Sequence, residues 1–260
     1  MKQLSRHQEI VNLVQQHGYV STEDLVEQFK VSPQTIRRDL NELADENKIR
    51  RHHGGATIPL SSVNTAYTTR KVMQLNEKDT IAEALAKHIP DGATLFIDIG
   101  TTPESVAKAL VKNHKDLRVV TNNINVAMIL MANPDFKVIL AGGEVRNRDG
   151  GIVGEATLDF IKQFRLDFGI LGISGIDYDG SLLDFDYHEV RVKKAIIENS
   201  RSVYLAVDHT KFGRNAMVNL GSITELQMII TDQEPPEEIV AILKDNEIPK
   251  ILDTPAFHAR

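Results

Sequence analysis

A group of polar side chains between residues 32 and 41 has the chemistry needed to read DNA. The run begins Ser-Pro-Gln-Thr-Ile-Arg-Arg-Asp-Leu. An arginine can form two hydrogen bonds with guanine, and a glutamine or an asparagine can form two with adenine. At about 100° per residue, the polar positions fall opposite the apolar stripe of Ile36, Leu40 and Leu43. The predicted DNA contacts on this helix are Ser32, Gln34, Thr35, Arg37, Arg38 and Asn41.

The local sequence predicts that these positions form a helix. Ser32 can accept hydrogen bonds from the free amides of a first turn, and Pro33 suits the first helical position because its missing N–H is not needed there. No helix breaker follows until about Glu46. Taken alone, the stretch could equally be an ordinary surface helix with two arginines, so its neighbours must decide.

Two shorter helical patterns precede this stretch. An apolar stripe ends at Gly18, and Ser21 with Asp24 has the spacing of a capping box that opens a helix over residues 22–29. A very short turn at Val31 then joins two helices. This arrangement is typical of a helix-turn-helix, in which the second helix of the pair enters the major groove.

Residues 48–57 change from a helical pattern to a short strand and a Gly-Gly turn, which indicates the wing of a winged helix. Arg50 and Arg51 are predicted to contact DNA phosphates, a role that positions the protein without reading sequence. His52 and His53 are neighbours on this strand and would point to opposite faces, so a metal site there is disfavoured. The sequence predicts no metal and no cofactor.

Arg6, Ile10 and Val14, followed by residues 32–40 and by Arg-His-His-Gly-Gly-Ala at residues 51–56, resemble the N-terminal signature of the DeoR family of bacterial transcriptional regulators. The resemblance covers the whole first domain. It implies a winged helix-turn-helix that binds double-stranded operator DNA.

From residue 76 onward, apolar runs typical of strands alternate with helical patterns. Strands are expected near residues 94–100, 118–122, 137–141, 167–173, 202–207 and 228–231. Helices are expected near residues 77–89, 103–113, 124–132, 155–164, 186–199 and 237–245. Short, continuously apolar strands indicate a sheet covered on both faces, and the alternation predicts an α/β domain with a largely parallel sheet. The predicted organisation is a DNA-binding domain over 1–57, a linker over 58–75 and an α/β effector-binding and oligomerisation domain over 76–260.

Polar and glycine-rich residues follow the predicted strands. In an open α/β sheet the ligand crevice lies at the carboxyl ends of the strands. Gly100-Thr101-Thr102 directly before a helix offers backbone amides, two hydroxyls and a positive helix end, which suits a phosphate, and Lys211 could complete that site. The predicted effector-binding residues are Asp98, Gly100, Thr101, Thr102, Asn122, Asn123, Gly142, Gly143, Glu144, Ser174, Gly175, Asp184 and Lys211. Any single loop of this kind could also be a simple turn or helix cap.

The second domain resembles the sensor half of the same family, whose fold is similar to ribose-5-phosphate isomerase. The resemblance implies a repressor that a small phosphorylated polyol or sugar, glycerol 3-phosphate above all, releases from DNA. An enzyme is the rival interpretation, an isomerase fused to a DNA-binding module. The loop at residues 172–175 lacks an acid, however, and Val192, Lys193 and Lys194 occupy the positions nearest to a catalytic base. We therefore expect no enzymatic activity. A winged helix used only for protein contacts is a weaker alternative.

The composition is that of a globular protein with 260 residues, a net charge of −6 and no cysteine. Eight Lys or Arg balance eight Asp or Glu in residues 1–62, so the whole negative charge falls on the remainder. A neutral DNA-binding module with few cations should bind weakly alone, and we expect a homo-oligomer, a dimer or a tetramer, on paired half-sites. No apolar run reaches membrane-spanning length and no signal peptide is evident, so a cytoplasmic location is expected.

Overall fold

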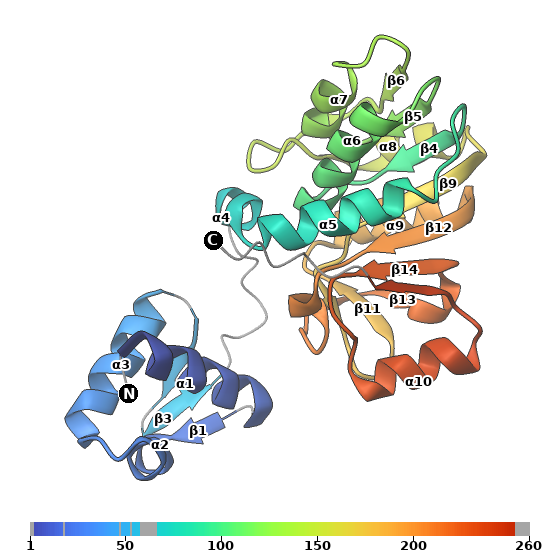
Figure 1. Cartoon of the computed structure of the whole chain (residues 1–260). Coiled ribbons are helices and arrows are strands. Elements are labelled where there is room, and N and C mark those ends of the chain that lie inside the picture. The colour runs from blue at the N-terminus through green and yellow to red at the C-terminus, as the bar shows by residue number, and fades with distance from the viewer. Residues whose placement is uncertain (1–2, 18, 47, 53, 58–66, 253–260) are drawn as a thin grey trace. The chain divides into compact units, whose positions relative to one another are not determined.

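The computed structural model describes residues 3–17, 19–46, 48–52, 54–57 and 67–252, and the chain divides into two compact units, residues 1–63 and 64–260 (Figure 1). Each unit is described by itself. None of the described helices is long and apolar enough to cross a membrane.

The first unit is a small helical bundle with a three-stranded antiparallel sheet. Its elements are α1 (Gln3–His17), β1 (Tyr19–Ser21), α2 (Thr22–Phe29), α3 (Pro33–Asp45), β2 (Arg50–His52) and β3 (Gly55–Thr57). Strand β3 lies between β1 and β2, which makes the predicted wing. The core collects apolar side chains from all three helices, including Ile10, Val14, Leu25 and Ile36.

Helix α3 begins and ends where its sequence predicts. The Ser32 side chain accepts a hydrogen bond from the Thr35 amide at 3.2 Å, and Pro33 is the first helical residue. Ile36, Leu40 and Leu43 are all 0% exposed, so the predicted buried stripe is confirmed. The capping box that opens α2 is also present.

The second unit is built on a seven-stranded parallel sheet with the order β15-β14-β12-β9-β4-β5-β6. The strands are β4 (Thr94–Ile97), β5 (Arg118–Thr121), β6 (Lys137–Leu140), β9 (Leu166–Leu171), β12 (Ser200–Ala206), β14 (Met228–Thr231) and β15 (Lys250–Leu252). The predicted α/β class with a largely parallel sheet is confirmed.

Helices cover both faces of this sheet. They are α4 (Tyr67–Val72), α5 (Leu75–Ala86), α6 (Thr101–Asn113), α7 (Ile124–Leu130), α8 (Glu155–Ile161), α9 (Tyr187–Glu198) and α10 (Glu237–Asp245), with short 3-10 turns η1 (His209–Lys211) and η2 (Ile223–Glu225). Helices α5, α6 and α7 share one apolar core, and α8, α9 and α10 share the other. The central strands β4, β5, β9, β12 and β14 are therefore largely buried, which explains their apolar runs, whereas the edge strand β6 is mostly exposed.

Several short elements were not predicted from the sequence. A second, antiparallel sheet joins β10 (Gly175–Ile176), β11 (Ser181–Asp184) and β13 (Val218–Ser222), and β7 (Glu144–Val145) pairs with β8 (Ile152–Val153). These strands have at most five residues, too few to show a periodic pattern. Residues 67–72, which fall within the predicted linker, form helix α4. Residues 73 and 74 form a turn and Leu75 begins α5, so the predicted linker is in part structured, while its residues 58–66 lie outside the described residues.

Candidate DNA interface and effector site

The predicted DNA-reading side chains lie on the exposed face of α3. Gln34, Arg37, Arg38 and Asn41 are exposed, on the side of the helix opposite its buried stripe. The Arg38 guanidinium donates to Glu42 on the next turn at 2.9 Å, an exposed contact that costs little to exchange for DNA. The remaining predicted contacts flank this face: Ser32 and Arg50 are exposed, and Thr35 and Arg51 are half-buried.

A buried ion pair holds α3 against α1. Both nitrogens of the Arg6 fork donate to the Asp39 carboxylate, at 2.5 and 3.0 Å, and His7 Nε2 lies 3.0 Å from the same carboxylate. Burial alone would raise the pKa of Asp39, but the hydrogen bonds from Arg6 and His7 hold it below its ordinary value. The Arg6–Asp39 pair was not predicted from the sequence, because its members are 33 positions apart. Asp39 thus holds the buried side of α3 against α1, away from the face with the predicted DNA contacts.

The loops that follow the central strands meet at one edge of the sheet. Strand β4 lies between β9 and β5, so the loops after these three strands are neighbours. Thr101 and Thr102 are buried in the first turn of α6. A Cβ atom on Gly172, after β9, would lie 3.2 Å from the Pro103 ring, which shows how closely the β9 loop approaches this turn.

Two predicted effector ligands, Asp98 and Asp184, belong to an internal ion-pair cluster around Lys193. The Lys193 ammonium contacts Asp98, donates to the Gly172 carbonyl at 3.1 Å and lies 3.7 Å from Asp184. Ser174, a third predicted ligand, donates to Asp184 at 2.7 Å. Burial disfavours the ammonium, yet Asp98, Asp184 and Glu189 together raise the pKa of Lys193. Lys193 therefore joins the loops after β4 and β9 to Asp184. The sequence suggested no ligand-site role for Lys193, which was named only as lying near the position of a catalytic base.

Asn122 and Asn123, which follow β5, each have one buried side-chain atom without a hydrogen-bond partner among the described residues. Both are 0% exposed. Asn122 Nδ2 donates to the Ile152 carbonyl at 3.2 Å, and Asn123 Oδ1 accepts from the Asn125 amide at 2.8 Å. Asn122 Oδ1 and Asn123 Nδ2 have no hydrogen-bond partner among the described residues. Buried polar atoms are nearly always hydrogen-bonded, so one acceptor and one donor are available there for a polar ligand.

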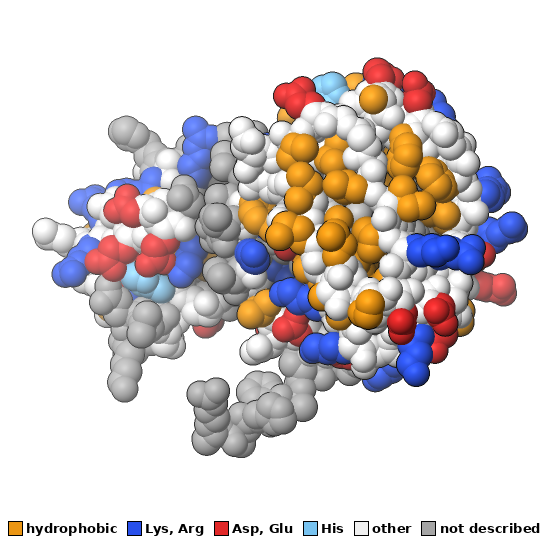
Figure 2. All heavy atoms as spheres, turned by 90° about the horizontal axis from the view of Figure 1, so that it is seen from above, with side chains coloured by type: hydrophobic (Ala, Val, Ile, Leu, Met, Phe, Trp, Pro, Cys, Tyr) orange, Lys and Arg blue, Asp and Glu red, His pale blue; other side chains and the backbone are white. Residues whose placement is uncertain are grey.

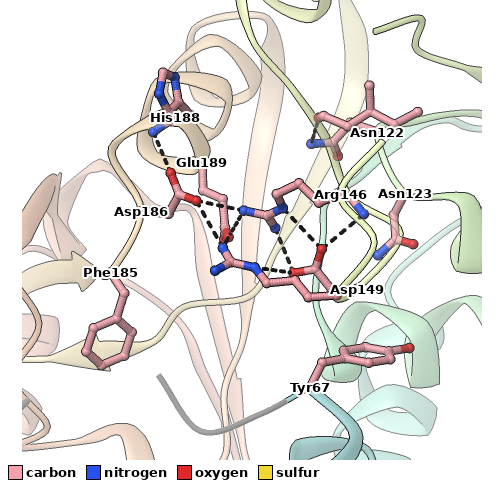
Figure 3. Close-up of polar contacts among 12 residues, drawn as sticks. Tyr67, Asn122, Asn123, Arg146, Asp149, Phe185, Asp186, His188 and Glu189 are labelled. Atoms are coloured by element: carbon pink, nitrogen blue, oxygen red, sulfur yellow. Dashed lines mark hydrogen bonds and ion pairs between the residues drawn. The ribbon is translucent and has the colours of Figure 1, made fainter. Parts of the chain in front are cut away.

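Two arginines that were not predicted as site residues tie the β7–β8 hairpin to α9 (Figure 3). Arg146 contacts Asp149 at 2.7 Å and Asp186 at 2.9 Å, and it also pairs with Glu189. Arg148 donates to Asp186 at 3.0 Å. The charges of the two arginines and the three acids balance to within one. The ion pairs hold the hairpin against α9, and the Ile152 carbonyl of the same hairpin accepts from Asn122.

Three of the predicted effector residues lie in the loop after β6 and at the start of β7. Gly142, Gly143 and Glu144 are exposed, and the structure does not bring them into the buried group of Thr101, Thr102 and the asparagines. Gly143 has a positive φ of 149°, and a Cβ there would lie 2.8 Å from Ile152, so glycine is required by the fold. Their role in ligand binding stays a prediction.

Four cations, called here the cation cluster, act on one another electrostatically. Lys211, the one predicted member, and Arg214 follow β12, Lys78 lies on α5 and Arg70 lies on α4. Burial lowers the pKa of Lys211 to about 8, Asp208 opposes the shift, and Arg214, Lys78 and Arg70 add to it. Burial also lowers the pKa of Lys78, and the negative charges of Asp208 and Glu104 oppose that shift. Cations that destabilise one another in this way favour the binding of an anion.

Gly175 fixes Arg214 in this cluster. A Cβ atom at residue 175 would lie 1.9 Å from the Arg214 carbonyl oxygen, so no other residue fits. The Arg214 guanidinium lies 5.2 Å from the centre of the Phe185 ring. The predicted residues Gly175 and Lys211 therefore both belong to this part of the sensor unit. Gly175 leaves room for the Arg214 backbone, and Lys211 provides a positive charge.

Comparisons with known proteins agree with this division of the chain. Residues 6–62 match the DeoR-like helix-turn-helix domain, and residues 73–233 match the DeoR C terminal sensor domain. The chain is 67% identical to the glycerol-3-phosphate regulon repressor of Escherichia coli, over 95% of this chain and 98% of that protein. It is 57% identical to the repressor of the same name from Haemophilus influenzae, over 97% and 98%.

Two solved structures are similar to this chain at low sequence identity. The eIF2B beta subunit of Chaetomium thermophilum matches with a TM-score of 0.50 and 13% identity, over 93% of this chain and 82% of that chain. Ribose 5 phosphate isomerase A from Neisseria gonorrhoeae matches with a TM-score of 0.39 and 16% identity, over 52% of each chain.

Proposed function

The chain belongs to the DeoR family of transcriptional regulators, and from this premise we propose that it represses genes of glycerol 3-phosphate metabolism and leaves its operators when it binds glycerol 3-phosphate. The proposal is supported by the cation cluster at the carboxyl edge of the sensor sheet, which occurs on the same chain as the exposed polar face of α3. The relatives with the highest identities reported above are repressors named for the glycerol-3-phosphate regulon, which supports this effector and disfavours an isomerase.

A small polyol phosphate suits the two parts of the sensor site. The phosphate would bind between the first turn of α6, at Thr101 and Thr102, and the cations Lys211 and Arg214. The hydroxyls would take the unused acceptor and donor of Asn122 and Asn123. A ligand that supplies both a dianion and hydroxyls satisfies both parts at once.

Glycerol 3-phosphate binding can be measured directly by calorimetry on the full chain without DNA. We expect saturable binding of glycerol 3-phosphate and much weaker binding of glycerol or inorganic phosphate, since each lacks half of the recognised groups. Binding should weaken as the pH rises above about 8, because Lys211 then loses its proton. Failure of glycerol 3-phosphate to bind any better than inorganic phosphate would contradict this effector.

On the DNA side, Arg38 is proposed to read a base and Arg37 to hold a phosphate. Replacement of Arg38 by alanine should cost about 1–3 kcal/mol of binding to a specific operator and relax the preference at one base pair. Arg37→Ala is the matched control, because loss of a phosphate contact should weaken binding to specific and random duplexes alike. The measurement is a titration of both variants against a duplex that the wild-type chain selects from a random library. Equal losses on both duplexes for Arg38→Ala would refute the assigned register.

We also propose that the chain works as a homo-oligomer in the cytoplasm, where its DNA is. One face of the sensor unit gathers apolar side chains (Figure 2). Met128 of α7 and Met131, which follows that helix, are 68% and 71% exposed, and Ile139, Leu140 and Val145 on β6 and β7 are also exposed. Among the described strands, β6 pairs with β5 alone and ends the sheet. Exposed apolar edges of this kind are usually covered by association, which supports a dimer or a larger assembly on paired half-sites.

A further inference from the structure

Helix α4 is the first described element after the DNA-binding unit. Residues 58–66 join β3 to α4, so the covalent path between the two units passes through this helix. Whatever α4 contacts in the sensor unit can therefore act on the connection. Its contacts are with parts of the proposed effector site.

The amino end of α4 is anchored to the first turn of α6. The Tyr67 hydroxyl lies 2.8 and 2.9 Å from the two carboxylate oxygens of Glu104, and it accepts a hydrogen bond from Asn125 at 3.0 Å. Glu104 is buried, one turn after Thr101 in α6. Asn125 also donates to the Asp149 carbonyl at 2.9 Å, and Figure 3 shows Tyr67 near Asp149. Tyr67 therefore contacts α6 through Glu104 and α7 through Asn125.

The carboxyl end of α4 is held by the cation cluster. The Lys78 ammonium donates to the carbonyls of Arg70 and Met73, each at 2.5 Å. The positive charge of Arg70 lowers the pKa of Lys78, Lys211 and Arg214, and its backbone carbonyl accepts from Lys78. An anion bound among these side chains would attract Arg70 and repel the Glu104 carboxylate. It would act on Glu104, which binds Tyr67, and on Lys78, which binds the carboxyl end of α4.

We propose that α4 is part of the effector site: Arg70 supplies a cation to the bound phosphate, and Tyr67, through Glu104, makes the position of α4 depend on whether the site is occupied. The inference rests on the proposed function and extends it, since it assigns ligand binding to the connector as well as to the sensor sheet. A ligand shifts the equilibrium between the operator-bound and released states only as far as its affinities for those two states differ. A position of α4 that differs between the two states would supply this difference in affinity.

The first test compares Arg70→Gln with Lys71→Gln in the full chain without DNA. Lys71 is the exposed neighbour on the same helix, so both variants lose one positive charge. Arg70→Gln should weaken glycerol 3-phosphate binding about tenfold, because a charged hydrogen bond to phosphate is lost, while Lys71→Gln should stay within about twofold of the wild type. Arg70→Lys should restore part of the affinity, which would exclude misfolding as the cause. Equal affinities for the two glutamine variants would overturn the assignment of Arg70.

The second test concerns Tyr67. The quantity measured is the ratio of operator dissociation constants with and without saturating glycerol 3-phosphate, on a duplex selected by the wild-type chain. Tyr67→Phe should reduce this ratio at least about threefold, whereas Tyr187→Phe, at an exposed tyrosine of α9, should leave it unchanged. An unchanged ratio for Tyr67→Phe would overturn the role of α4. A wild-type chain that binds no glycerol 3-phosphate would instead overturn the proposed function and this inference with it.

Discussion

Replacement of Lys193 by methionine is expected to destabilise the sensor unit by about 3–5 kcal/mol, because it leaves buried carboxylates without their cation. Lys193 is 1% exposed and contacts Asp98, which is equally buried, while Asp184 lies 3.7 Å away. Methionine fills a similar volume, so the loss should come from charge and not from a cavity. Urea unfolding followed by circular dichroism gives the free energy of unfolding.

The pH dependence and a double variant distinguish this cause from a packing defect. Burial already raises the pKa of Asp98 in the presence of Lys193. Without the lysine, a protonated Asp98 needs no partner, so the difference in stability between wild type and variant should narrow as the pH falls. Asp98→Asn combined with Lys193→Met should recover part of the lost stability at neutral pH. A penalty that is independent of pH and unchanged in the double variant would refute the electrostatic explanation.

Replacement of Asp39 by asparagine should cost the DNA-binding unit about 3 kcal/mol, because Arg6 loses the buried carboxylate that it pairs with. The core of this unit is small, so such a loss should open it detectably. Hydrogen exchange followed by mass spectrometry can report residues 3–57 separately from the sensor unit. Operator binding should weaken as α3 loses its support, while glycerol 3-phosphate binding should stay at the wild-type value.

Asp45→Asn is the matched control for Asp39→Asn, since Asp45 is exposed on the same helix and should leave both properties unchanged. The folded-state pKa of Asp39 lies below its ordinary value of 3.8, so its contribution is complete above that value and is lost as the pH falls through the folded-state pKa. If Asp39→Asn exchanged and bound DNA like Asp45→Asn, the pair with Arg6 would not be supporting the recognition helix.

The features that could be predicted from sequence are those set by neighbouring residues. The Ser32 cap, the Pro33 start and the stripe of Ile36 and Leu40 depend on contacts within a few turns, and the structure confirms them. The parallel strands were predictable for a related reason, since burial on both faces makes each strand continuously apolar.

Contacts between distant residues could not be predicted in this way. Asp98 and Lys193 are 95 residues apart, and neither residue's neighbourhood indicates that they meet. Lys211 follows a predicted strand, where ligand residues are expected, whereas Arg70 and Lys78 lie on helices and have no such signal in the sequence. Helix α4 has six residues, too short for a helical period to stand out from the surrounding polar sequence.

An operator-release titration shows whether a polyol phosphate bound in the sensor unit releases the DNA-binding unit from its operator. A duplex selected by the wild-type chain is held at half saturation, and glycerol 3-phosphate is added while fluorescence anisotropy reports bound DNA. Glycerol and inorganic phosphate serve as controls at the same concentrations and ionic strength. We expect millimolar glycerol 3-phosphate to raise the apparent operator dissociation constant about tenfold or more, with either control within about twofold of the starting value. An operator dissociation constant that glycerol 3-phosphate leaves unchanged would contradict the account.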